Sequence, residues 1–112
     1  MKWTEQQALF KAMIKEEMDL LNKKGSEYAS DADALDNFKR QAEDWGCDPL
    51  LVLAFGLGKH YRSIQSYIRK GGKVVSNEPI SGRIHDARNY LFLLHCLISE
   101  AETPKEVIIS GK

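Results

Sequence analysis

The sequence predicts an all-α protein, a single-domain bundle of about four helices. Its 112 residues are 43 % hydrophobic, which is enough for one modest core and too little for a second. Apolar residues recur at helical spacing in four segments bounded by glycine, proline or aspartate. The apolar runs at 74–75 and 107–109 are too short to build a sheet by themselves. We therefore expect the bundle over 1–102 and a C-terminal tail over 103–112.

The first helix is expected to run from Thr4 to about Lys23. Thr4 can cap the helix while Gln7 reaches back to it in a capping box. Gly25 follows as a favourable C-terminal glycine.

Aspartate, proline and glycine mark the other three helices. The second is expected to begin at 31 or 33 and to end at Trp45-Gly46. The third has a clear start, because Asp48 can cap it and Pro49 fits its first turn, and it should end at Gly71-Gly72. The fourth is expected from about 77 to 99. Short connections between these helices favour antiparallel neighbours.

Glu17 is a charged residue within an otherwise apolar helix side. At about 100° per residue, the first helix brings six apolar residues to one side: Trp3, Phe10, Met13, Ile14, Leu20 and Leu21. A buried carboxylate without a partner is unfavourable. We therefore expect Glu17 to pair with a lysine or arginine, to bind a metal, or to border a water-filled cleft.

The fourth helix combines an apolar half with a polar stripe. The segment from Tyr90 to Ile98 is apolar nearly all round, apart from His95, and is expected to be central in the bundle. The first half carries five residues on one face: Glu78, Gly82, His85, Asp86 and Asn89. Such a stripe is expected to face a cavity or a partner. Gly82 either clears space beside the carboxylates or allows close helix packing.

The third helix becomes amphipathic after Leu57. Tyr61, Ile64 and Ile68 are expected on its buried side, and the opposite side is basic. The residues of that basic side are Lys59, Arg62, Ser66 and Lys70. A stripe of this kind is either a solvated face or a phosphate site. His60, at its margin, is either an ordinary hydrogen-bonded histidine or an acid/base group.

Charge and composition narrow the possible functions. The chain has 16 basic and 16 acidic residues, which argues against direct nucleic-acid binding. Residues 1–48 carry a net charge of −4 and residues 49–112 a net charge of +4, so a mixed-charge cleft for a metal-bound polyphosphate is possible. There is no apolar run of membrane-spanning length and no signal-peptide profile, so we expect a cytoplasmic protein without membrane contact. Cys47 and Cys96 fit no metal spacing.

The acidic candidates converge on one metal hypothesis. Three helices can contribute charged residues to one site: Glu17 from the first, Lys59 and Arg62 from the third, and Glu78 and Asp86 from the fourth. Oxygen ligands of this kind suit Mg²⁺ or Mn²⁺, which bind a few carboxylates together with substrate phosphates.

Three motifs in this order resemble a known family. The chain contains KGSEYA at 24–29, then DALDNFKR at 33–40, and EPISGRIHD at 78–86 followed by Asn89 and Tyr90. Lys59 and Arg62 lie where an intervening K-x-x-R falls. The set is similar to the phage-type, nucleotide-modification-associated, MazG-like branch of the all-α NTP pyrophosphatases. It spans about residues 17–95.

This resemblance implies an activity and a set of roles. The implied protein is a phage-encoded, Mg²⁺-dependent hydrolase that converts a nucleoside triphosphate to the monophosphate and pyrophosphate. It implies a homo-oligomer, a dimer or tetramer, in the cytoplasm of a bacterium or a phage-infected host cell. Glu78 and Asp86 carry over as metal ligands, whereas Glu17 is assigned by its helix position. The implied binding residues are Asn37, Asn89, Lys59 and Arg62. We expect Glu27 to orient the attacking water, and Tyr28, Phe38 or Tyr90 to stack on the base.

Two positions depart from the family pattern. The family commonly has an acid before the lysine of K-x-x-R, where this chain has Gly58, and another acid at the position of Gly82. A different class therefore stays open. In that alternative, the chain is a catalytically inactive phage accessory protein that binds nucleotides or a host protein. A third alternative is a purely structural helical oligomer.

Overall fold

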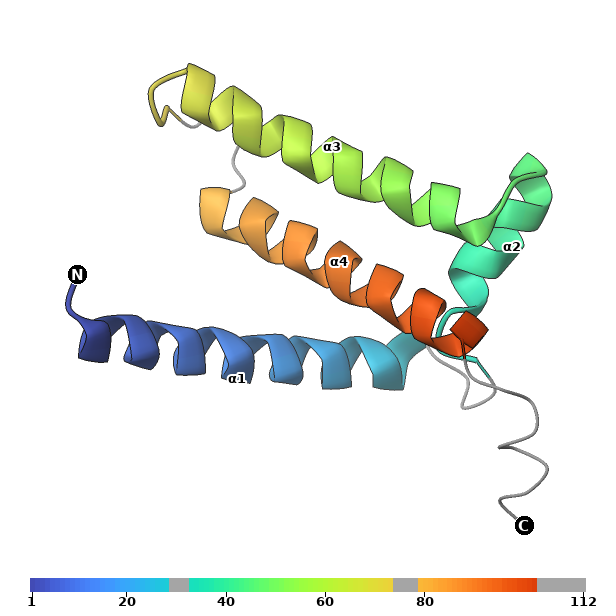
Figure 1. The fold of residues 1–112 in the computed structure, drawn as a ribbon, viewed down its shortest axis with the longest axis horizontal. Coiled ribbons are helices and arrows are strands. Elements are labelled where there is room, and N and C mark those ends of the chain that lie inside the picture. The colour runs from blue at the N-terminus through green and yellow to red at the C-terminus, as the bar shows by residue number, and fades with distance from the viewer. Residues whose placement is uncertain (29–32, 74–78, 103–112) are drawn as a thin grey trace, which may run out of the picture. The chain divides into compact units, whose positions relative to one another are not determined.

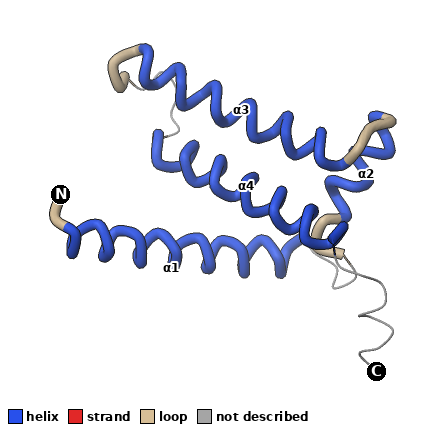
Figure 2. Tube along the Cα trace, viewed as in Figure 1, coloured by secondary structure: helices blue, strands red, loops and turns tan. Residues whose placement is uncertain are grey.

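The computed structural model describes residues 1–28, 33–73 and 79–102, and this part of the chain is all-α (Figures 1 and 2). Its four helices are α1 (Trp3–Tyr28), α2 (Asp36–Trp45), α3 (Pro49–Arg69) and α4 (Ile80–Glu102). None of the described residues forms a strand, so the predicted fold class is confirmed. The apolar runs at 74–75 and 107–109, and the tail over 103–112, lie outside the described residues. Within them, no helix has the length and hydrophobicity that crossing a bilayer requires.

The chain divides into two compact units, Met1–Asp36 and Asn37–Lys112, and each is described by itself. The first contains α1, whose start differs from the prediction. The Gln6 amide donates to the Lys2 carbonyl at 2.9 Å, so the helix begins before Thr4 and Thr4 lies inside the first turn. The helix also continues through Gly25 to Tyr28. A glycine weakens a helix by only about 1 kcal/mol, and the neighbouring lysine, serine and glutamate do not stop it.

The apolar side of α1 is more exposed than its periodicity predicted. Met13, Leu20 and Glu17 are half-buried. Four of the expected apolar residues are instead exposed by 40–69 %: Trp3, Phe10, Ile14 and Leu21. The prediction of a buried side was wrong at these four positions, because periodicity identifies the face that can be covered and does not provide the cover.

The start of α2 is displaced by a turn that Asp33 makes. The Asp33 side chain accepts a hydrogen bond from the Leu35 amide at 2.9 Å, and its carbonyl accepts one from the Asp36 amide at 3.3 Å. Asp33 therefore shapes the turn before the helix, and α2 begins at Asp36, three residues after the later of the two expected starts. The predicted end is confirmed, since α2 ends at Trp45 and Gly46 has a φ of 68°.

Both predicted ends of α3 are confirmed. The Asp48 side chain accepts a hydrogen bond from the Leu50 amide at 2.9 Å, and Pro49 occupies the first turn, where its missing N–H is not needed. At the other end, the Lys70 amide donates to the Ser66 carbonyl at 3.0 Å. Gly71 and Gly72 then take φ values of 67° and 82°, a backbone conformation that glycine adopts readily.

In the second unit, α3 and α4 pack side by side and run antiparallel (Figure 1). The most deeply buried apolar residues of this unit come from all three of its helices: Ala42, Val52, Leu53 and Leu97. Leu53 is only 1 % exposed.

Parts of the expected buried sides of α3 and α4 are on the surface. Ile64 is half-buried, but Tyr61 is 58 % exposed and Ile68 is 67 % exposed. In the segment from Tyr90 to Ile98, Leu97 is buried, whereas the other residues are half-buried or exposed. The prediction that this segment is central was therefore wrong for the single chain. Within the second unit, α3 and α2 cover only part of the surface of α4.

Candidate functional site

Three contacts in antiparallel register link α3 to α4. Gly56 faces Tyr90, His60 faces Asp86, and Ser63 faces Arg83. Each step of three or four residues along α3 is matched by an equal step back along α4, which keeps the pairs on the facing sides of both helices. We call these six residues, all in the second unit, the cross-helix cluster.

The Tyr90 ring lies directly on the backbone of α3. A Cβ atom at Gly56 would collide with the Tyr90 Cε1 atom, so glycine is what allows this approach. Phe38 of α2 meets the same ring edge-on, with ring centroids 6.4 Å apart. The His60 ring lies 5.2 Å from it at a tilt of 43°. Tyr90 of α4 is therefore contacted by residues of both other helices of the unit, α2 and α3.

The charged part of the cluster begins at His60. The His60 Nδ1 atom lies 3.8 Å from the Asp86 Oδ2 atom, and the two side chains are 20 % and 31 % exposed. This separation is longer than a hydrogen bond, so the two side chains lie close together without being bonded. Asp86 is thus half-buried beside the imidazole ring of His60, and its side chain still reaches solvent.

The second polar contact lies one turn further along α3. Arg83 Nη1 donates a hydrogen bond to Ser63 Oγ at 2.7 Å. The Ser63 hydroxyl in turn donates to the Lys59 carbonyl at 3.3 Å. Together these bonds fix the guanidinium of Arg83 next to the His60–Asp86 pair along α4.

The predicted phosphate contacts lie on α3 beside the cluster. Lys59 and Arg62 are both exposed, as a site for a soluble polyphosphate requires. The Nη1 atom of Arg62 lies 3.3 Å from the place that a Cβ atom at Gly58 would occupy. A guanidinium therefore covers the position at which the resembled family commonly has an acid.

The predicted nucleotide-binding residues are only partly brought together. Phe38 and Tyr90 are in contact, as described above, and Asn89 next to Tyr90 is half-buried. Asn37, at the start of α2, is exposed. The remaining members of the polar stripe on α4 that the structure describes, Gly82 and His85, are half-buried. The side chains of Glu27 and Tyr28 lie outside the described part of the chain.

The three predicted metal ligands are not all in one described part of the chain. Asp86 belongs to the cross-helix cluster, Glu17 is half-buried on α1 in the other unit, and Glu78 lies outside the described residues. In 1–28, 33–73 and 79–102, no three or more acidic, histidine or cysteine side chains gather as a metal site would require. Mg²⁺ commonly uses one or two carboxylates and takes its other ligands from water and phosphates. Among the described predicted ligands, the cluster offers such an ion one carboxylate, Asp86, whose side chain is 31 % exposed.

Sequence reasoning missed three members of the cluster, Gly56, Ser63 and Arg83. Gly56 carried a usable signal, because a glycine within the apolar run 50–57 indicates close approach of another element. Ser63 and Arg83 carried none, since polar residues on a predicted amphipathic helix are ordinarily assigned to solvent.

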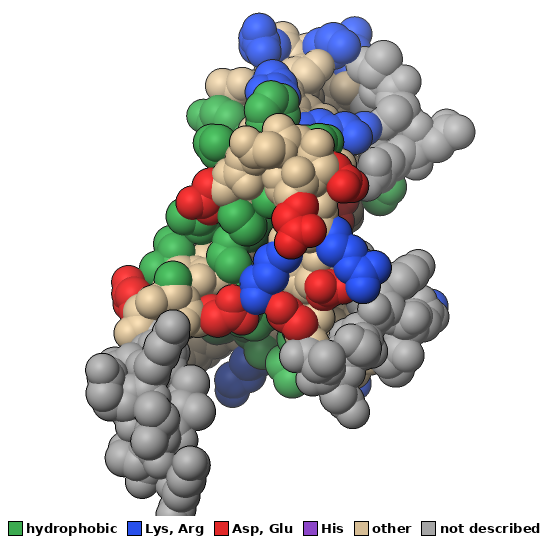
Figure 3. Space-filling model, turned by 90° about the vertical axis from the view of Figure 1, so that its right-hand side faces the viewer, with side chains coloured by type: hydrophobic (Ala, Val, Ile, Leu, Met, Phe, Trp, Pro, Cys, Tyr) green, Lys and Arg blue, Asp and Glu red, His purple; other side chains and the backbone are tan. Residues whose placement is uncertain are grey.

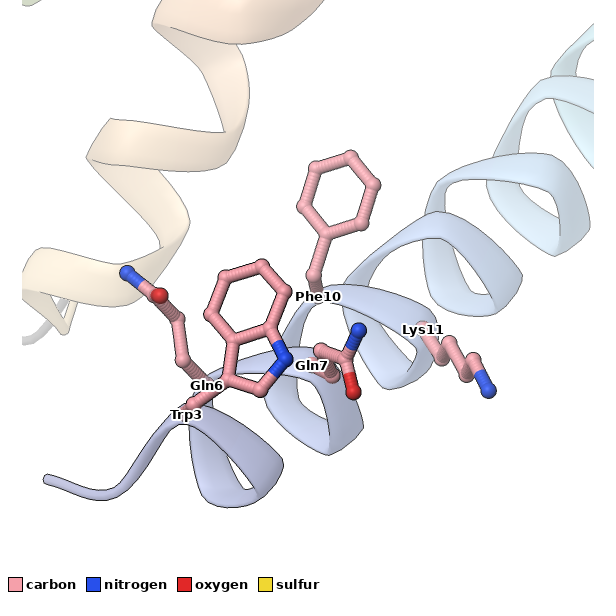
Figure 4. Close-up of a pocket in the computed structure, with 5 residues that line it drawn as sticks. All are labelled: Trp3, Gln6, Gln7, Phe10 and Lys11. Carbon is pink, nitrogen blue, oxygen red and sulfur yellow. The ribbon is translucent and has the colours of Figure 1, made fainter.

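A shallow hollow on α1 has no such chemistry. It is lined by Trp3, Gln6, Gln7, Phe10 and Lys11 (Figure 4). All five residues belong to one helix, and no acidic, histidine or cysteine side chain lines the hollow. The hollow therefore offers no carboxylate to a metal ion among these five residues, whereas the cross-helix cluster contains Asp86.

No protein-family model, no curated protein and no solved structure matches this chain.

Proposed function

We propose that this chain is a MazG-like, Mg²⁺-dependent nucleoside triphosphate pyrophosphohydrolase. The supporting observation is the position of Asp86, a half-buried carboxylate at the α3–α4 contact that keeps 31 % of its surface exposed. Tyr90, one turn from Asp86 on α4, contacts Phe38 of α2, and these two aromatic residues come from separate motifs of the resemblance. Two segments far apart in the sequence thus contribute to one half-buried region, as an active site requires.

The reaction joins a water oxygen to the α-phosphorus and breaks its bond to the oxygen that leaves with pyrophosphate. Asp86 would bind Mg²⁺, with Glu78 and Glu17 as the further ligands that the sequence alone predicts, and the ion would neutralise charge on the phosphate oxygens. Glu27 accepts the proton of the attacking water. Glu27 is therefore the general base of the proposal.

The substrate is held by cations, amides and rings in this proposal. Lys59 and Arg62 offset the negative charge that develops on the phosphate oxygens. Asn37 and Asn89 position the nucleotide through their amides. Tyr28, Phe38 or Tyr90 stacks on the base in this proposal, and such stacking accepts any base because every base has a π-face.

A second candidate function is nucleotide or host-protein binding without catalysis. It is favoured by the guanidinium of Arg62 at Gly58, where the resembled family has an acid, and by the engagement of Asp86 with His60. Both features describe a site whose charges are already partly balanced within the chain.

Melting curves combined with pyrophosphate release discriminate these functions. With Mg²⁺ and a deoxynucleoside triphosphate at 100 times its dissociation constant, the folded state gains about 2.7 kcal/mol, which raises the melting temperature. We expect this rise together with release of pyrophosphate from at least one member of a dNTP panel. A rise without release supports the binding function. No rise with any dNTP contradicts the hydrolase and nucleotide binding and points to an interaction or structural role. Omission of Mg²⁺ is the matched control.

We also propose that the protein is a homo-oligomer, a dimer or tetramer, that acts in the cytoplasm of a bacterium or phage-infected cell. Large apolar side chains on the second unit support the assembly: Phe55, Tyr61 and Ile68 on α3, and Leu91 and Phe92 on α4, are 47–69 % exposed. Figure 3 shows hydrophobic side chains beside interspersed acidic and basic ones on one face. Covering apolar surface stabilises an assembly by about 25 cal/mol per Å².

Sedimentation velocity at micromolar concentration tests the assembly. We expect a sedimentation coefficient of a dimer or tetramer that changes little with ionic strength, because the exposed apolar residues provide the contact. A coefficient of the 12.7 kDa monomer alone at these concentrations would contradict the proposal.

A further inference from the structure

Both helices of the α3–α4 pair carry a row of apolar residues spaced alternately four and three apart. On α3 the row occupies positions 50, 54, 57, 61, 64 and 68, and on α4 it occupies positions 80, 84, 87, 91, 94 and 98. Residues at this spacing stay on one side of a helix, and it is the spacing of the seams along which helices pack in bundles. Each helix therefore has a seam suited to a further helix.

The two rows lie on the same face of the pair. The contacts of the cross-helix cluster define the line along which α3 and α4 face each other. At about 100° per residue, the exposed members of the rows lie about 120–140° from this line on α3 and about 80–120° from it on α4, each counted along its own chain direction. In two antiparallel helices, displacements of the same sense lie on the same face of the pair (Figure 1). We call the twelve positions the apolar face.

Half of the apolar face is formed by large side chains that are exposed by 37–67 %: Leu50, Tyr61 and Ile68 on α3, and Ile84, Leu91 and Ile98 on α4. These six leave roughly 500 Å² uncovered per chain, taking 150–200 Å² for a fully exposed large residue. Pairing two such faces would cover roughly 1,000 Å², the area at which specific protein interfaces begin.

The residues proposed to contact the substrate lie on the other face of the pair. Lys59 and Arg62 on α3, and Asp86 and Asn89 on α4, are displaced from the contact line in the opposite sense. An assembly through the apolar face would therefore leave these four residues accessible to a ligand.

We propose that the apolar face binds the same face of a second copy of this chain, so that two α3–α4 pairs form a four-helix bundle. A two-fold contact uses the same patch on both copies, and none of the twelve positions is charged, so symmetric pairing brings no like charges together in the seam. This inference rests on the homo-oligomer proposed above and does not depend on the hydrolase activity.

Two neighbouring residues on α4 provide a matched test. Leu91 is 52 % exposed and lies on the apolar face, whereas Phe92 is 47 % exposed and lies outside it. We expect Leu91→Lys to raise the dissociation constant of the dimer by at least about 100-fold, because the contact would bury an unpaired charge. Phe92→Lys should leave the constant within about threefold of the wild type. Sedimentation equilibrium of the full chain over a dilution series measures both.

A second pair on α3 keeps the test decisive if Leu91→Lys does not fold, which circular dichroism checks. Ile68 is 67 % exposed on the apolar face near the end of α3, and Phe55 is 69 % exposed outside that face. Ile68→Lys is expected to weaken the dimer by at least about tenfold, whereas Phe55→Lys should not.

The outcomes distinguish the surface from the assembly. If the wild type is a dimer and the folded Leu91→Lys and Ile68→Lys chains remain equally tight dimers, the apolar face is the wrong surface and the homo-oligomer stands. Dissociation by Phe92→Lys or Phe55→Lys to the same extent also overturns the assignment of the surface. A wild type that is monomeric at micromolar concentration overturns both, and the face is then covered by another part of the chain or by a different protein. Pyrophosphate release, measured separately, tests the hydrolase.

Discussion

Asp86→Asn is expected to abolish pyrophosphate release, with a loss of at least about 100-fold, while the chain stays folded. The substitution keeps the size of the side chain and removes the negative charge that a divalent cation requires. The contact with His60 spans 3.8 Å and both side chains reach solvent, so its loss lowers stability by about 1 kcal/mol or less. Release is measured with a coupled phosphate assay and folding by thermal melting.

Asp44→Asn is the matched control for this variant. Asp44 is an exposed carboxylate on α2 and has no assigned role in the site, so its replacement should leave release unchanged. Unchanged release from the Asp86→Asn chain would remove the metal hypothesis. Loss of release in the Asp44→Asn chain would indicate that net charge, and not Asp86, determines the rate.

Gly56→Ala is expected to produce the largest loss of stability among single-methyl substitutions in α3. The new Cβ would collide with Tyr90 Cε1 and lie 2.6 Å from its Cζ, so the ring or the helix must move. Overpacking of this kind commonly lowers the free energy of unfolding by about 1–3 kcal/mol, more than the gain in helix propensity from glycine to alanine. Each kcal/mol corresponds to about 4–8 °C in melting temperature for a small domain.

Gly58→Ala provides a control on the same helix. Its Cβ would meet the end of a flexible side chain, with Arg62 Nη1 at 3.3 Å, and that guanidinium can move away. We therefore expect Gly58→Ala to be neutral or to raise stability by up to about 1 kcal/mol through helix propensity. In a double-mutant cycle, Tyr90→Leu should remove most of the loss from Gly56→Ala. Equal melting temperatures for the two single glycine variants would contradict the close packing of Tyr90.

The sequence predicts those features that are determined by residues close together in the chain. The start of α3 was predictable because Asp48 and Pro49 satisfy the first turn locally, and its end because two glycines accept positive φ. The end of α1 was not predictable, since a glycine such as Gly25 allows a helix to end but does not force it to end. The sequence does not distinguish a helix start at Asp33 from a turn there, because an aspartate that caps a helix and one that closes a turn look alike in a sequence.

The candidate site was predictable as a set of residue types and much less as a set of contacts. The polar stripe on α4 identified Asp86, but its partner depended on the register between α3 and α4, which no single helix specifies. The exposure of Tyr61 and Ile68 was unpredictable for a related reason, since a helical period does not say which neighbour covers an apolar side. Gly56 and Tyr90 fix that register together, and they are 34 residues apart in the sequence.

The matched spacing of the α3 and α4 contacts makes the second unit sensitive to changes in length. One residue inserted between Gly56 and His60 would rotate everything after it by about 100° relative to everything before it. The contact of Tyr90 with Gly56 could then be kept only if Asp86 lost its contact with His60. An insertion between the two helices would leave the phase of each intact. Evolutionary or engineered gains and losses of residues are therefore tolerable between α3 and α4 and disruptive within 56–63.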